Sequence, residues 1–381
     1  MRRERVKKVG VTLRSSFVVL ILLLFAHSAQ ASNIVEIAVA PRDIPFLLDD
    51  EGQVWAFRKP QFLEEPIKLP NLNHIKKIAP YIAVDTSGRV FTWSLNTVKT
   101  DWDQESISEA VYNVPQKVDG LQGVTSIASS GYDYFVAVVG NKEIRDWSTI
   151  QDKPGAGTVT NGPIRTVISR AGVKAVAATS RPKVVSIKGA ILKPVTETMV
   201  ALFDDGTVMG WGITPSEPAT EEATRNGMLL TKLPGAAGIA MNDVHTVILS
   251  ADGVPIFWGG CGPYVAKDSN GHPWSPSGVN GQVVEIKEMA INQGNDNVLP
   301  DAFIKRDGSV WAAYAPSPVD KDCIRSGGDK RRAWQLTAGA AAAIQVAAAD
   351  SIFMLDAERK LWTTAGSWMN TKFHSVMINL K

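Results

Sequence analysis

The chain has 381 residues, of which 45% are hydrophobic and 20% charged, and its formal net charge is +2 at pH 7. Residues 1–31 hold six of the 40 basic and one of the 38 acidic residues, so the remaining chain has a formal charge of −3. Such a chain lacks the basic surface typical of nucleic-acid-binding proteins, and we exclude nucleic acid as a partner.

The N-terminal segment predicts export. A basic stretch, MRRERVKKVGVTLRSS, precedes the apolar run FVVLILLLFA at 17–26, and HSAQA then ends in Ala29-Gln30-Ala31. This order is typical of a secretory signal peptide, here 1–31 and cleaved after Ala31. The apolar run is shorter than the ~20 residues of a membrane span, so we expect no stable membrane insertion after cleavage. The mature protein is then secreted or periplasmic, and an uncleaved anchor is the alternative.

Seven short hairpins recur along the rest of the chain. Three are built on an Asp-Gly pair between two apolar runs, and two more place a Gly two or three residues after an Asp, because Gly accepts positive φ without steric strain. From residues 46, 82, 135, 200, 247, 303 and 353 they read FLLDDEGQVWAFR, IAVDTSGRVFTWS, FVAVVGNKEIRDWS, VALFDDGTVMGWG, VILSADGVPIFWGG, FIKRDGSVWAAYA and FMLDAERKLWTTA. Intervals of roughly 35 to 65 residues are typical of propellers and other repeat proteins.

Each hairpin carries one tryptophan in its second strand. These residues are Trp55, Trp93, Trp147, Trp211, Trp258, Trp311 and Trp362. In copies one, two, four, five and six the Trp follows the turn Gly by three or five residues, so strand alternation places these five on one face. Burying so large a side chain requires a neighbouring sheet. Copies three and seven are degenerate, with GNKE and Arg359 at the turn.

Further strands complete each unit. Apolar runs precede most hairpins, at 34–40, 75–79, 124–129, 184–189, 285–291 and 343–349, and proline-marked segments at 66–70 and 114–118 are typical of a fourth strand. We therefore expect an all-β fold, a seven-bladed β-propeller of four-stranded antiparallel blades, formed by 32–381 as one domain. The long gap at 149–183 is either an insertion or a decayed repeat.

The unit IAMNDVHTVILSADGVPIFWGG, from Ile239, resembles the repeat of the regulator-of-chromosome-condensation (RCC1-like) family. The resemblance spans the chain after residue 31 and implies that family's seven-bladed propeller. The N-x-x-G-Q-L-G segment of the repeat is missing and only His245 fills its His position, so the chain resembles a divergent, exported, bacterial-type member. Secreted bacterial relatives in that family include a beta-lactamase inhibitory protein, which implies an inhibitor-like role.

Cys261 and Cys323 follow the third strands of the fifth and sixth copies. We expect both in loops on the same rim of adjacent blades. In an oxidising compartment this favours a disulfide, provided that their Cα atoms lie within ~7 Å. Two free or buried thiols are the alternative.

Few residues point to catalysis. DEGQVW, from Asp50, resembles the Asp-box of sialidases, a structural turn in that family, and we interpret the turn acids as caps of their own backbone. The histidines after residue 31 lack metal-ligand spacing, and nucleophile-elbow, phosphate-loop and dinucleotide motifs are absent from the sequence. We predict no cofactor, metal site or catalytic residue. The alternative is a secreted glycan-active hydrolase or lyase that uses carboxylates at the channel mouth.

The loops between first and second strands gather around the channel mouth on one face. They contain acidic residues and one compact amphipathic group of the kind enriched in protein interfaces. The predicted binding residues are Asp43, Asp243 and Asp296, with Tyr132, Asp133 and Tyr134. We expect a binding module for another protein or a cell-surface glycan. The rival site is among the loops carrying Trp102, Trp274 and Trp334, which we expect on the opposite face.

Overall fold

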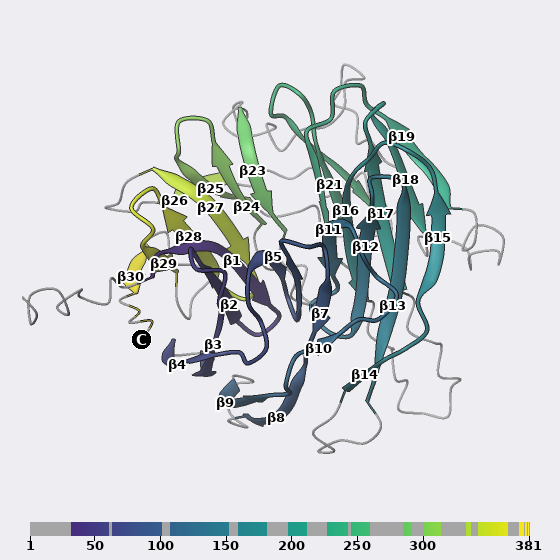
Figure 1. The fold of residues 1–381 in the computed structure, drawn as a ribbon. Coiled ribbons are helices and arrows are strands. Elements are labelled where there is room, and N and C mark those ends of the chain that lie inside the picture. Colours follow the sequence, from purple (N-terminus) through teal and green to yellow (C-terminus); the bar gives the residue numbers. More distant parts are fainter. Residues whose placement is uncertain are drawn as a thin grey trace, which may run out of the picture.

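The computed structural model describes residues 32–60, 63–100, 107–151, 159–180, 197–211, 227–242, 245–259, 285–291, 301–313, 333–336, 342–364, 373–376, 378 and 380. Within these residues the chain forms β-strands and connecting turns, with no α-helix. The strands form seven consecutive antiparallel sheets, which are the blades of a seven-bladed β-propeller (Figure 1). The predicted fold class is confirmed.

The first three blades occupy residues 34–169. Blade one comprises β1 (Ile34–Ala40), β2 (Ile44–Asp49), β3 (Val54–Lys59) and β4 (Glu64–Lys68). Blade two comprises β5 (Ile75–Ala79), β6 (Ile82–Asp85), β7 (Val90–Thr92) and β10 (Gln116–Lys117), with the hairpin β8 (Leu95–Thr100) and β9 (Ile107–Tyr112) inserted between β7 and β10. Blade three comprises β11 (Val124–Ser129), β12 (Tyr134–Val139), β13 (Glu143–Gln151), β14 (Val159–Asn161) and β15 (Arg165–Ser169).

The last four blades run from residue 173 to the C-terminus. Blade four comprises β16 (Val173–Ser180), β17 (Glu197–Phe203), β18 (Thr207–Trp211) and β19 (Met228–Lys232). Blade five comprises β20 (Gly238–Met241), β21 (His245–Leu249) and β22 (Pro255–Gly259), and the segment that would hold its fourth strand lies outside the described residues. Blade six comprises β23 (Ile286–Ala290), β24 (Asp301–Lys305), β25 (Val310–Ala313) and β26 (Ala333–Leu336), and blade seven comprises β27 (Ala343–Ala348), β28 (Ile352–Asp356), β29 (Leu361–Thr363) and β30 (His374–Val376).

The first strands of successive blades contact one another around the ring and are therefore its innermost strands. The ring closes where β1 of blade one meets β27 of blade seven, so the two ends of the described chain lie side by side (Figure 1). Each sheet takes its strands from one continuous stretch of chain. Closure therefore depends on contacts between blades.

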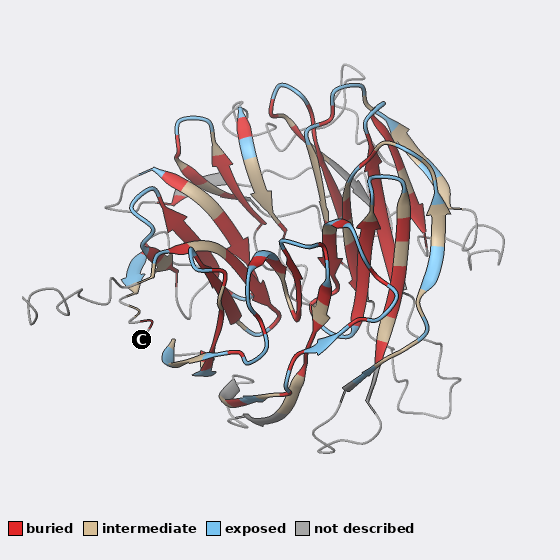
Figure 2. Ribbon diagram, in the orientation of Figure 1, coloured by how far each residue is buried: buried red, intermediate tan, exposed pale blue. Residues whose placement is uncertain are grey.

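The hairpin tryptophans pack toward the preceding blade. Trp55 lies in a core cluster with residues of blade seven, and Trp93 contacts Phe46 of blade one with ring centroids 5.4 Å apart. Trp211 packs with blade three, and Trp311 with blade five. The expected common face is confirmed for these four, while the side chain of Trp258 lies outside the description. The buried strand centres in Figure 2 mark these cores between blades.

The turn glycines bind one blade to the next. At Gly52 φ is 75°, and its carbonyl accepts the backbone N–H of Ile75 in blade two at 3.0 Å. At Gly253 the carbonyl accepts Ile286 N–H of blade six at 2.9 Å, and a Cβ would lie 2.5 Å from that nitrogen. Glycine is needed here both for its backbone conformation and for this close approach.

The region at 149–183 is not a decayed repeat, and its described part contains an insertion within blade three. Its described parts extend β13, form β14 and β15 of blade three, and form β16, which pairs with β17 as the first strand of blade four. Our assignment of that first strand to 184–189 is wrong, because β16 already fills its place beside β17. VKAVAATS, at 173–180, has the required apolar alternation but stands further from the hairpin than in the other units.

Candidate functional site

The hairpin-turn aspartates are occupied by their own turns. The Oδ1 atom of Asp49 accepts the backbone N–H groups of Glu51 at 3.1 Å and Gln53 at 2.7 Å. Its Oδ2 atom accepts the buried indole N–H of Trp55 at 2.8 Å. The carboxylates that accept a backbone N–H two residues further on also include those of Asp85, Asp205, Asp307 and Asp356. The interpretation of these acids as structural caps is confirmed.

Asp43 lies in the first-to-second loop of blade one, with a φ of 55°. Its two carboxylate oxygens accept the backbone N–H and the hydroxyl of Ser351 at 2.7 and 2.6 Å. Burial raises the pKa of Asp43 to about 6, although the Ser351 bonds oppose this rise. Ser351 lies in the corresponding loop of blade seven, so the Asp43–Ser351 pair, which we call the clasp, links the first and last blades of the ring. A role for Asp43 in ligand binding stays a prediction.

The amphipathic loop of blade three divides into exposed and buried parts. Tyr132 is 41% exposed and Asp133 is also exposed, whereas Tyr134 is buried and its hydroxyl donates to Asp146 at 3.1 Å. The Ser130 hydroxyl accepts the backbone N–H groups of Tyr132 and Tyr134, each at 3.3 Å. Tyr132 and Asp133 can therefore reach a partner directly, while Tyr134 positions the loop.

The first-to-second and third-to-fourth loops share one face, because alternate connections in an antiparallel sheet leave the same strand ends. The Thr149 N–H of β13 bonds the Asp133 carbonyl at 2.8 Å, so the C-terminal part of this third strand lies at the first-to-second loop of blade three. Third strands therefore end on the face of the first-to-second loops, and not on the opposite face where we expected the loops that carry Trp102, Trp274 and Trp334. Trp334 belongs to β26, not to a loop, and Trp102 and Trp274 lie outside the described residues.

Beneath this face, which we call the loop face, an aromatic cluster joins blades one and two. The Phe46 ring makes edge contacts with Tyr81, Trp93 and Tyr112, with centroids 5.1, 5.4 and 5.8 Å apart. Tyr112, from the inserted hairpin, also donates its hydroxyl to the Phe57 carbonyl at 2.9 Å. The insertion is therefore packed onto the rim of blade one rather than free of it.

On the opposite, turn side of the ring, a hollow of about 400 Å³ is lined by Glu36, Glu288, Gln345, Lys76 and Arg359, among others. Burial raises the pKa of both Glu36 and Glu288 to about 7. The hydrogen bond from the Ile78 N–H and the charge of Lys77 lower the pKa of Glu36 in part, and the negative charge of Glu288 raises it further. These groups were not predicted from the sequence. Their signal was a polar residue in the apolar first strands IVEIAVA, IKEMA and AIQVAA.

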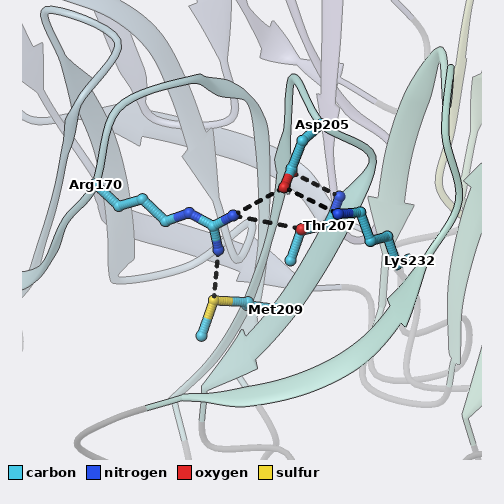
Figure 3. Close-up of polar contacts among 5 residues, drawn as sticks. All are labelled: Arg170, Asp205, Thr207, Met209 and Lys232. Atoms are coloured by element: carbon cyan, nitrogen blue, oxygen red, sulfur yellow. Dashed lines mark hydrogen bonds and ion pairs between the residues drawn. The ribbon is translucent and has the colours of Figure 1, made fainter.

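A second polar cluster joins blades three and four on their outer part (Figure 3). The guanidinium of Arg170 lies 4.2 Å from the Phe203 ring centroid and bonds Asp205 at 3.2 Å. Lys232 approaches the same carboxylate at 3.5 Å, and bonding from Thr207, with smaller effects of Lys232 and Arg170, lowers the pKa of Asp205. These side chains satisfy one another, which indicates an inter-blade contact.

Four of the residues predicted from the sequence lie outside the described residues: Asp243, Asp296, Cys261 and Cys323. The part of the chain that is described contains no group of His, Cys, Asp and Glu side chains able to hold a metal ion. That same part also has no helix long and apolar enough to cross a membrane.

Seven blades of consecutive strands place this chain among the β-propellers. No protein-family description and no curated protein sequence matches it. Human WBSCR16 is similar in structure at 13% identity, with 84% of this chain and 85% of that chain covered and a TM-score of 0.47. Yeast RCC1 (Prp20), solved bound to Kap60, is 15% identical over 95% of this chain and 86% of its own, with a TM-score of 0.46. At such identities the likeness concerns the fold alone.

Proposed function

We propose that this chain is an exported propeller that binds another protein through the loop face. The observation that carries the proposal is the position of the large apolar side chains that are exposed. Within the described residues these are Val111, Val114, Tyr132 and Leu229. The first three lie in connections of blades two and three on the loop face. Apolar side chains exposed there offer surface that a partner could remove from water.

The loop of Tyr132 suits a protein partner. Its backbone is held by Ser130, so little conformational freedom is lost when the ring contacts a partner. A tyrosine beside an exposed carboxylate offers apolar area together with polar contacts, as protein interfaces do. Inhibitor-like binding, in which the propeller blocks its partner, is the form that the RCC1-like resemblance implies. A cell-surface glycan is the other partner to test.

Export is part of the same proposal. The basic and apolar order of residues 1–31 supports a signal peptide cleaved after Ala31 and a secreted or periplasmic protein. In that compartment we propose a disulfide between Cys261 and Cys323. Mass measurement of the exported protein should give an N-terminus at Ser32, and an N-terminus at Met1 would contradict export.

The test is an affinity capture with the chain tagged at its C-terminus, exposed to envelope and secreted fractions. We expect a protein that the wild type retains and that the double variant Tyr132→Ala, Asp133→Ala loses. The matched control is Leu229→Ala, which removes an exposed apolar side chain from the fourth strand of blade four and should retain the partner. Retention by all three would contradict the chosen face, and retention by none would contradict protein binding.

A glycan-active hydrolase or lyase is the second candidate. Glu36 and Glu288 favour it, because two carboxyl groups with pKa values near 7 share a hollow with Arg359. Glycosidases use such a pair as acid and base or nucleophile. Hydrolysis of a glycan panel that Glu36→Gln abolishes would establish the enzyme. We place it second because each carboxylate already accepts a backbone N–H of the next blade.

A further inference from the structure

Three first strands carry the same contact with the next blade. The Ile78 N–H of blade two bonds Glu36 of blade one at 3.1 Å, and the Val346 N–H of blade seven bonds Glu288 of blade six at 3.3 Å. Gln345 of blade seven accepts the Ile37 N–H of blade one at 2.8 Å. Each of the three side chains directly follows a register shift in its strand. They are equivalent positions in the repeat.

Gln345 differs from the two glutamates in one respect. Its amide also donates to the Ile37 carbonyl at 3.1 Å, so it satisfies both polar groups of one residue in the facing strand. An ionised carboxylate offers acceptors only, whereas a protonated one offers a donor and an acceptor, as an amide does. We propose that Glu36 and Glu288 are proton-dependent latches between blades, which hold the ring more tightly when protonated than when ionised.

Their surroundings support this proposal. The cations on adjoining strands and turns include Lys76, Lys77, Lys287, Lys305 and Arg359. The buried carboxylates at the ends of the adjoining second strands, Asp49, Asp85 and Asp356, are bonded within their own turns. Lys76 and Lys287 donate to the carbonyls of Val124 and Ala343, which draws their charges toward other acceptors. Burial therefore outweighs the nearby cations, and the pKa of both glutamates rises to about 7.

The direction of the pH effect follows. With a folded-state pKa of about 7 against 4.5 for the free side chain, the folded protein binds more protons between these values. The latches contribute their full stability below pH 4.5 and lose it as pH rises through 7. The hollow that reaches both carboxyl groups gives protons access to them.

The test is the thermal midpoint of the full chain between pH 5 and 8.5. We expect Glu36→Gln with Glu288→Gln to raise the midpoint at pH 8.5 by roughly 4–8 °C and to leave it nearly unchanged at pH 5. The reciprocal variant Gln345→Glu should lower the midpoint at pH 8.5 more than at pH 5. All other titratable groups are the same in the wild type and in every variant. The difference in thermal midpoint between a variant and the wild type at each pH therefore reports the latches alone.

Two outcomes would overturn the proposal. One is a double variant whose midpoint falls with pH as steeply as that of the wild type. The other is a Gln345→Glu variant whose thermal midpoint falls by the same amount at pH 5 and pH 8.5, because an equal loss would indicate a steric effect. Should the double variant fail to fold, Glu36→Gln and Glu288→Gln are measured singly, and hydrogen exchange at Ile78 or Val346 slower than in wild type at pH 8.5 is the expected result. Unchanged or faster exchange counts against the latches.

Discussion

Asp49 and Asp50 are neighbours in one turn, but only Asp49 is buried and bonded to three donors. We expect Asp49→Ala to lower the free energy of unfolding by about 3 kcal/mol, because the Trp55 indole and two backbone N–H groups lose their acceptor. Urea denaturation measures this loss. Asp50 lies on the surface and bonds Asn33, so Asp50→Ala should change stability by less than about 1 kcal/mol.

Equal losses in the two variants would contradict the assignment of Asp49 as the structural acid of this turn. The contrast matters because DEGQVW drew attention to Asp50 in the sequence. Adjacent acids cannot be told apart by spacing alone, since the identity of the buried one depends on the register of β2 with β3.

The same limit applies to the predicted binding residues. Spacing placed Asp43 and Tyr134 in first-to-second loops, or at their ends, and the structure agrees. It did not show that Ser351, 308 residues away, occupies the Asp43 carboxylate, or that Tyr134 turns inward to Asp146. Loop membership can be predicted from strand order, but side-chain direction depends on contacts between blades.

Among the strands, ring closure depends on contacts between blades one and seven, because these two blades exchange no strand within the described residues. Their polar contacts include Asp43 with Ser351 and Gln345 with Ile37. We expect Asp43→Ala to cost about 2–3 kcal/mol, because two donors of Ser351 lose a buried acceptor. Hydrogen exchange should then show the contact between β1 and β27 opening before the other blade boundaries.

A double-mutant cycle checks this prediction. Ser351→Ala alone should cost about 1 kcal/mol, and adding it to Asp43→Ala should cost little more, because the two residues act as one contact. Asp119→Ala, at an exposed position on blade two, is the control and should stay within about 0.5 kcal/mol of wild type. Additive losses for Asp43 and Ser351 would contradict a shared clasp.

Element boundaries could be predicted wherever hairpin and first strand lie close together in sequence. Blades one and two fit this case, including fourth strands at the expected prolines. The inserted hairpin β8–β9 and the β13–β14 extension were missed, since they interrupt a unit without adding a repeat signal. Blade four was misassigned because the segment between β16 and β17 is longer than the equivalent loops.

For the whole molecule, the remaining prediction concerns Cys261 and Cys323, which follow β22 of blade five and β25 of blade six. Both strands end on the loop face, and blades five and six are neighbours in the ring. A disulfide there closes a loop of about 62 residues, which limits its stabilisation to about 4 kcal/mol by chain entropy.

We expect non-reducing mass analysis of exported protein to show no free thiol, and reduction to lower the thermal midpoint. The variant Cys261→Ser, Cys323→Ser should match the reduced wild type and be insensitive to reductant. Two free thiols in the exported protein would contradict the disulfide.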